Sequence, residues 1–236
     1  MKRIYKSKKI VGPIKILAVL SVGLATMRSA QAETTITFDG AGLVDNKDMP
    51  QSYGDFASTS GNGINVNAGL DVVGTPNIGL TWGPGTGDVV DWYASWDGRG
   101  SVAQLDYNIN GGAPISITFT PDSAYGVLLN SFDMDEWAGG GSMSVDWSVS
   151  DANGILASGN WARSTGGRDT IFTGLTVADI NVGQPVELTF TGLSGQGSYF
   201  AVDNLTFDQV QAVPEPTTLA LMALGLGAVV IRCRRK

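Results

Sequence analysis

Alternation of apolar and polar residues is the feature that most constrains the fold of this 236-residue chain. Met143, Val145, Trp147 and Val149 alternate with serine and aspartate. The same period of two recurs in segments 36–38, 64–70, 103–109, 115–119 and 186–190. Because successive side chains of a strand point to opposite faces, this period predicts half-buried strands and no helix between residues 33 and 212.

Turn-forming residues separate the alternating segments. Asn110-Gly111-Gly112, Asn153-Gly154 and the glycine-rich run 192–197 supply the positive-φ positions that tight hairpins need. About eight to eleven antiparallel strands follow from this spacing. Short antiparallel strands with one apolar face pack as two sheets, so we expect an all-β, antiparallel β-sandwich of the jelly-roll type.

The N-terminus has the order of a secretory signal peptide. Six basic residues within the first 15 positions precede an apolar run at 16–25 and the small residues Ala30 and Ala32. We expect a signal helix over residues 1–32 and cleavage by signal peptidase between Ala32 and Glu33. A plain N-terminal anchor is the alternative, but the apolar run is short for a membrane span.

The C-terminus combines a proline-rich motif, an apolar segment and a basic cluster. The motif is Pro214-Glu215-Pro216, and the apolar segment covers 219–231. As a helix that segment would be about 20 Å long, so it would only marginally span a hydrocarbon core of about 30 Å. The basic cluster contains Arg232, Arg234 and Arg235. The positive-inside rule places this cluster in the cytoplasm and the preceding domain outside, so we predict a transmembrane sorting helix in the inner membrane.

These three parts, over residues 213–236, together resemble the PEP-CTERM sorting signal of Gram-negative bacteria. The resemblance implies processing by exosortase near Pro214 to Pro216, after transient anchoring in the inner membrane. It also implies delivery to the cell surface or the extracellular space, often with exopolysaccharide production and biofilm formation. A plain C-terminal anchor after a stiff linker is the alternative.

Charge and composition exclude several functions for the domain between the two signals, residues 33–212. It holds four basic and 21 acidic residues, a net charge near −17, which argues against a nucleic-acid partner. The chain has no histidine, and its one cysteine, Cys233, lies in the tail. Serine–histidine or cysteine–histidine catalysis, a histidine- or cysteine-ligated zinc site and a disulfide are therefore excluded from the domain.

The last expected strand changes its apolar face across Asp203-Asn204, which predicts a β-bulge there. The string 201–207 also resembles the closing strand of PEP-CTERM proteins and of jelly-roll carbohydrate-binding modules. In some of those modules an acid in this strand binds a structural Ca²⁺, so the resemblance makes Asp203 a candidate ligand, with Asp39 as its companion. The alternative is that Asp203 caps local backbone amides.

Tryptophans and carboxylates gather in segment 82–97, and Trp92, Trp96 and Asp97 are candidate polysaccharide-binding residues. Exposed aromatic faces stack on sugar rings, and nearby aspartates accept hydrogen bonds from hydroxyls. The alternative is that these tryptophans belong to the core, as we expect of Trp147.

A second acidic cluster, Asp133, Asp135 and Glu136, raises the alternative of a secreted glycan hydrolase that uses an Asp/Glu pair. We expect Asp133 and Asp135 to share one face of a strand, about 7 Å apart, and Glu136 to open a solvated loop. Neighbours on one strand do not supply the geometry of hydrolysis. We therefore predict a non-enzymatic surface or matrix protein that binds polysaccharide; a purely structural matrix protein is the third hypothesis.

Overall fold

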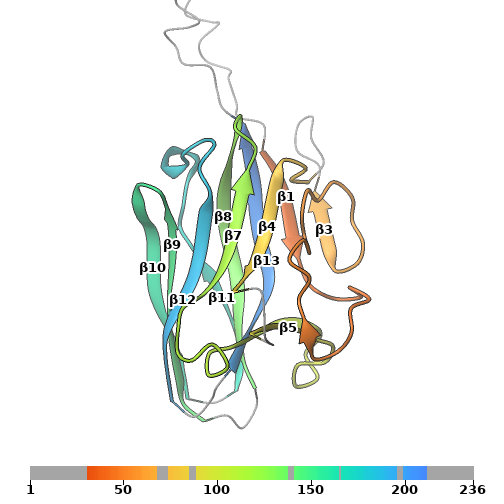
Figure 1. Ribbon diagram of the computed structural model, residues 1–236, viewed down its shortest axis with the longest axis vertical. Helices are drawn as coiled ribbons and strands as arrows, with labels where there is room; N and C mark the ends of the chain where they lie inside the picture. Colours follow the sequence, from red (N-terminus) through yellow and green to blue (C-terminus); the bar gives the residue numbers. More distant parts are fainter. Residues whose placement is uncertain are drawn as a thin grey trace, which may run out of the picture.

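Two antiparallel sheets packed face to face form the domain in the computed structural model, which describes residues 31–67, 74–84, 89–137, 141–164, 166–195 and 199–211 (Figure 1). The larger sheet contains β1 (Gln31–Ile36), β2 (Lys47–Asp48), β3 (Ile64–Asn67), β5 (Val90–Tyr93), β6 (Val102–Asp106), β8 (Tyr125–Glu136), β11 (Gly167–Phe172) and β13 (Tyr199–Gln211). The smaller sheet contains β4 (Ile78–Gly83), β7 (Ile115–Pro121), β9 (Met143–Asp151), β10 (Gly154–Arg163) and β12 (Val186–Gly195). The predicted β-sandwich is confirmed.

The described residues hold thirteen strands and one 3-10 turn, η1 (Val177–Asp179), so the estimate of eight to eleven strands was too low. One reason is β10, in which only Trp161 is buried. A strand that is mostly exposed on both faces carries no clear alternation. Another reason is β2, which has only two residues.

Strand β13 organises the eight-stranded sheet. It pairs with β8 along one side, and on its other side it pairs first with β6 and then with β1. The order is β11-β8-β13-β6-β5-β2, with β1 and β3 attached beside the second half of β13. The register with β8 shifts between Asp203 and Thr206, and Asn204 has a positive φ of 45°. The predicted β-bulge is therefore present at the predicted position.

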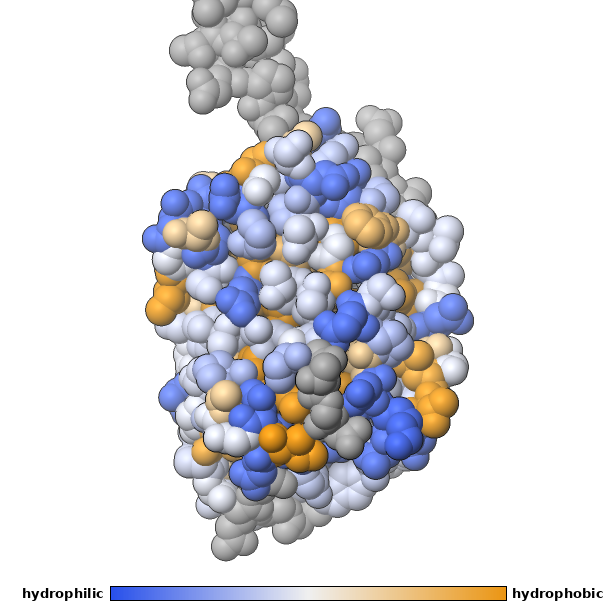
Figure 2. Space-filling model, viewed as in Figure 1, coloured by the Kyte–Doolittle hydropathy of each residue, from blue (hydrophilic) through white to orange (hydrophobic). Residues whose placement is uncertain are grey.

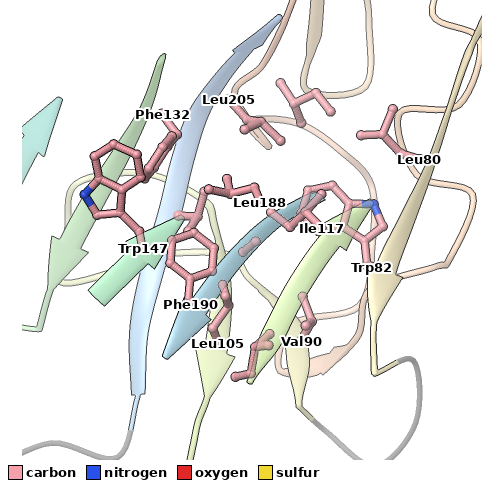
Figure 3. Packing of buried hydrophobic residues seen from close by; sticks show 14 of the residues in the cluster. Leu80, Trp82, Val90, Leu105, Ile117, Phe132, Trp147, Leu188, Phe190 and Leu205 are labelled. Atoms are coloured by element: carbon pink, nitrogen blue, oxygen red, sulfur yellow. The ribbon is translucent and has the colours of Figure 1, made fainter. Parts of the chain in front are cut away.

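The inward faces of the two sheets enclose one apolar core (Figure 3). Phe132 of β8 packs edge-on against Trp147 of β9 and Phe190 of β12, with ring centroids 5.6 and 5.8 Å apart. Trp147 is 8% exposed, which confirms its expected place in the core. Burying an aromatic side chain of this kind contributes roughly 1.5–3 kcal/mol to stability, so these contacts hold the sheets together.

On the face of the molecule shown in Figure 2, hydrophilic residues predominate and hydrophobic residues occur in small groups. This distribution follows from the alternation, since each inward apolar residue has polar neighbours that point outward.

The first and last strands end side by side. Gln31 pairs opposite Val210, so the described chain begins and ends at the same end of the sandwich (Figure 1). The predicted signal-peptidase site after Ala32 lies within β1, two residues along this strand. The rest of the predicted signal helix and the sorting helix lie outside the described residues. Within the described ranges, no helix has the length and apolar character needed to cross a bilayer.

Candidate functional site

The outer face of the eight-stranded sheet carries an unusual set of side chains at the end where β13 begins. Strand register aligns Arg168, Asp135, Ala201, Gln104 and Asp91 in one row across five strands. Residues in register share a face of a sheet. Since Phe200 and Val202 point into the core, this row points away from it.

A loop from Ala94 to Ser101 folds over this face. Its tight turn is closed by hydrogen bonds from the Trp96 amide to the Gly100 carbonyl and from the Arg99 amide to the Trp96 carbonyl, both 2.8 Å. The turn requires positive φ at Asp97 (48°) and at Gly98 (72°). As a result Trp96 lies on the sheet against Ala201, fully buried.

Three further aromatic rings surround Trp96. Trp137, Tyr93 and Tyr199 contact it edge-on, with centroids 5.2, 5.7 and 5.7 Å away and interplanar angles of 87°, 88° and 80°. Tyr93 and Trp137 are also perpendicular to each other, at 83°. These are the edge-to-face arrangements that aromatic pairs prefer.

A hollow of about 190 Å³ opens between these rings. We call it the aromatic pocket, and it is lined by Asn46, Tyr93, Trp96, Gln104, Trp137 and Tyr199. Four of these residues are aromatic and two carry uncharged amides, so the lining has no charged residue. Trp96 is fully buried, so Tyr93, Trp137 and Tyr199 supply the accessible aromatic surface. Apolar walls with a few polar groups are typical of small-molecule sites.

An ion-pair cluster lies beside the pocket on the same face; it consists of Arg99, Arg168, Asp133, Asp135 and Asp203. Arg99 Nη2 lies 2.6 Å from Asp135 Oδ1, and Arg168 Nε lies 3.0 Å from Asp135 Oδ2. Arg168 Nη1 lies 2.7 Å from Asp203 Oδ2 and 3.9 Å from Asp133 Oδ2. The three carboxylates are at most 7% exposed, so the two arginines offset charge that water cannot reach.

Burial shifts the acids of this cluster toward the protonated form. It raises the pKa of Asp203 to about 7, because the cost of desolvation exceeds the attraction of Arg168, while Asp39 and Asp133 raise the pKa further. Burial also raises the pKa of Asp135, although Arg168 and Arg99 lower it. The cluster is therefore sensitive to pH near neutrality.

Two of the three predicted polysaccharide-binding residues do not line the pocket. Trp92 is 7% exposed and belongs to the core, where its indole N–H donates to the Phe38 carbonyl at 3.2 Å. Its ring is thus unavailable for stacking, which corrects the prediction for this residue. Trp96 lies behind the pocket and is fully buried, so its ring supports the other aromatic rings and is not itself accessible for stacking. Asp97 lies outside the pocket and pairs with Arg99 at 3.5 Å.

The candidate calcium ligands have other partners. Asp203 pairs with Arg168, and its Oδ1 accepts the Asn204 amide at 2.7 Å, which is the capping alternative. Asp39 Oδ1 accepts the Ser101 amide at 3.1 Å. No group of three or more acidic or cysteine side chains suited to hold a metal is present in the described part of the chain. Arg168 thus supplies the positive charge that a cation would bring to Asp203.

The acids considered for hydrolysis do not form a catalytic pair. Asp133 and Asp135 share the outer face, as expected, but both contact Arg168. Glu136 follows Asp135 directly on β8, so it points to the opposite face. It is 1% exposed, which corrects the expectation of a solvated loop. Its backbone carbonyl accepts a hydrogen bond from Arg99 at 2.6 Å. Burial raises the pKa of Glu136, and its carboxylate oxygens have no hydrogen-bond partner.

Sequence reasoning did not assign Asn46, Tyr93, Gln104, Trp137 and Tyr199 to a common site. They come from five segments, and only the register of β5, β6 and β13 brings three of them together. One local signal existed: Val90 and Trp92 lie on the core-facing side of their strand, so the next residue, Tyr93, lies on the outer side.

Comparison with known proteins identifies the C-terminal segment. Residues 212–236 match the PEP-CTERM protein-sorting motif. A search of curated proteins finds no match to the chain.

Several solved structures resemble the chain at low identity. One is TmCBM61 in complex with β-1,4-galactotriose, 12% identical, with a TM-score of 0.28, covering 57% of this chain and 88% of its own. Another is the family 11 carbohydrate-binding module from Clostridium thermocellum, 12% identical, with a TM-score of 0.29, covering 60% and 93%. A third is a Stig cyclase from Fischerella, 14% identical, with a TM-score of 0.28, covering 76% and 86%.

Proposed function

We propose that this chain, which carries a C-terminal PEP-CTERM protein-sorting motif, is an exported surface protein that binds polysaccharide through its aromatic pocket without cleaving it. The observation that carries the proposal is the combination of two features at opposite ends of β13. The pocket residue Tyr199 begins this strand, and the sorting motif follows its last residue, Gln211.

The sorting motif supports export and exosortase processing. A signal peptide before residue 33 would deliver the domain across the inner membrane, and the arginines after residue 231 would remain in the cytoplasm. Exosortase would then act near Pro214 to Pro216 and release or attach the domain at the cell surface. The β1–β13 pairing suits this topology, because both membrane-directed segments leave one end of the domain.

The position of the pocket supports a role outside the membrane. β13 contains 13 residues from Tyr199 to Gln211. At about 3.3 Å per residue the strand is roughly 40 Å long, so the pocket lies far from the point where the tail begins. A domain held by its tail would thus present the pocket away from the membrane.

The lining of the pocket supports carbohydrate as the ligand. Sugar rings have apolar faces that stack on aromatic side chains, and their hydroxyl groups both donate and accept hydrogen bonds. The amides of Asn46 and Gln104 also donate and accept, so they are matched to hydroxyl groups. Such a protein would associate with exopolysaccharide and contribute to biofilm.

The ion pairs that the acidic residues form with arginine support binding without catalysis. A hydrolase needs two carboxyl groups that flank one bond, one of them protonated. Here Asp133 and Asp135 contact Arg168, and Glu136 lies on the other face of its strand. The glycan hydrolase alternative has no geometry in its favour.

A binding and turnover screen tests this function. The full-length protein, purified in a non-glycosidic detergent, would be run through gels that contain each of a panel of polysaccharides, and the same polymers would be assayed for release of reducing ends. We expect retarded migration with some of the polymers and no reducing ends. Retention by none of them would leave a purely structural matrix protein, and reducing ends that disappear in Asp135→Asn would favour the hydrolase.

Sorting is tested separately in cells. Replacement of Pro214, Glu215 and Pro216 by alanine should block processing and leave the larger, tail-bearing form in the inner membrane. Unchanged processing and surface delivery in this variant would contradict a role for exosortase.

A further inference from the structure

We infer that the aromatic pocket takes a single uncharged pyranose unit, such as a chain end or a side branch, and rejects uronic acids. This inference rests on the proposed function and specifies its ligand class. Three observations carry it: the angles between the rings, the size of the pocket and the absence of a charged residue from its lining.

The ring angles limit stacking to one sugar at a time. An extended polysaccharide binds along a row of roughly coplanar aromatic faces, one for each sugar. In the aromatic pocket Trp96 is close to perpendicular to Trp137, Tyr93 and Tyr199, and Tyr93 is perpendicular to Trp137. Rings in this arrangement form the walls of a box and not a platform.

The size of the pocket fits one ring. Its volume of about 190 Å³ is below the roughly 300 Å³ at which pockets for drug-sized ligands begin. A ligand of several sugar units would therefore extend well beyond the pocket.

The charge around the pocket excludes an anionic ligand. Arg99 and Arg168 are engaged by the buried aspartates of the ion-pair cluster. Arg163 pairs with Asp169 at 2.6 Å. Lys47 follows the pocket residue Asn46 and is exposed to solvent, but it is not among the residues that line the pocket.

A sugar carboxylate in the pocket would thus be desolvated without a cationic partner. Burying an unpaired charge is costly, and the domain between the two sorting signals already has a net charge near −17. A neutral sugar avoids both the desolvation of a charge and repulsion by the acidic domain. Its hydroxyl groups can form hydrogen bonds with the amides of Asn46 and Gln104.

Matched sugar pairs test the charge selectivity. The full-length protein in a non-glycosidic detergent would be titrated with glucose and glucuronic acid, and with galactose and galacturonic acid, at neutral pH. Tryptophan fluorescence and calorimetry would report binding. We expect at least one neutral sugar to bind at least about tenfold more tightly than its uronic acid, a difference of about 1.4 kcal/mol. Equal or tighter binding of the uronic acids would overturn the inference and leave carbohydrate binding intact.

Chain length tests the single-unit mode. A tetrasaccharide of the preferred sugar should bind within about threefold of its methyl glycoside, since only one ring enters the pocket. An affinity that rises more than about tenfold with length would overturn the single-unit mode. So would retention of a polysaccharide with which its own monosaccharides do not compete. Absence of any sugar or polysaccharide binding would contradict the proposed function itself.

Asn46→Gly ties the selectivity to the pocket. Asn46 has a positive φ of 56°, which glycine adopts without strain, so the variant removes the amide and keeps the backbone. We expect the affinity for the neutral sugar to fall at least about fivefold. Phe172→Ala removes a ring that is 76% exposed and lies outside the pocket, and it should leave the affinity unchanged. Loss of binding in Phe172→Ala but not in Asn46→Gly would place the ligand elsewhere.

Discussion

Arg168 on β11 and Asp203 on β13 form a 2.7 Å ion pair although β8 lies between their strands. The guanidinium crosses β8 and contacts Asp135 on it at 3.0 Å. One side chain therefore links three strands beside the aromatic pocket. The arrangement places three buried carboxylates within reach of two arginines, so its stability depends on both arginines being present.

Replacement of Arg168 by leucine should destabilise the fold by about 3–5 kcal/mol at neutral pH, because it leaves buried carboxylates without their main partner. Urea denaturation at neutral pH measures this loss. The loss should become smaller at pH 5, where the acids protonate more readily. A loss below about 1 kcal/mol would show that the cluster is solvated and behaves as a surface ion pair.

Arg163→Leu is the matched control for that substitution. Arg163 pairs with Asp169 at 2.6 Å and donates to the Arg168 carbonyl at 3.1 Å, but its ion-pair partner Asp169 is 47% exposed. A pair of this exposure contributes about 1 kcal/mol or less, so the control should be much milder than Arg168→Leu.

The stability of the protein should decrease as pH rises from about 4 to 7 through the contribution of Asp203. Burial raises the pKa of Asp203 to about 7 in the folded state, whereas an unfolded aspartate titrates near 3.9. Between these values the folded state holds a proton that the unfolded state has lost, and the slope approaches −1.4 kcal/mol per pH unit. Denaturation across this range, compared with Asp203→Asn, isolates the contribution. Parallel curves for the two proteins would contradict it.

The sequence was sufficient to predict the sandwich and the bulge, because both depend on local alternation. Apolar residues occupy even positions at Phe200 and Val202 but an odd position at Leu205. The register of β13 with β8 shifts between these positions. The core position of Trp92 could also have been predicted, since Trp92 lies two residues after Val90 and therefore on the same face of the strand. Its aspartate neighbours suggested a ligand-binding loop instead.

The aromatic pocket could not be predicted in this way, because it depends on register. Tyr93, Gln104 and Tyr199 lie on three strands, and Trp137 follows a fourth. A shift of one residue in any pairing would turn a strand's side chains to the other face. A local sequence pattern does not determine the register between two strands that lie nearly one hundred residues apart in the chain. The burial of Glu136 depends in the same way on strand pairing, since Glu136 lies in register with Gly167 of β11.

Addition of a chelator should leave the melting temperature unchanged, because Arg168 provides the positive charge beside Asp203. Asp203 and Asp39 are still the candidate calcium ligands of this chain, so scanning calorimetry with EGTA and with added Ca²⁺ is the direct measurement. A rise in melting temperature with Ca²⁺ that is absent in Asp203→Asn would show that calcium binds there and displaces the arginine.

Trp137→Ala should weaken sugar binding at least about tenfold while the protein remains folded. Trp137 lines the aromatic pocket and is partly exposed, in contrast to the fully buried Trp96, whose removal would disturb the fold. Loss of its ring removes one wall of the pocket and the stacking surface on it. Affinity electrophoresis in polysaccharide gels compares the variant with Phe172→Ala, which loses an exposed ring outside the pocket. Near-ultraviolet circular dichroism checks that the remaining aromatic packing is retained. If Trp137→Ala keeps full affinity with an unchanged spectrum, the pocket is not where the sugar binds.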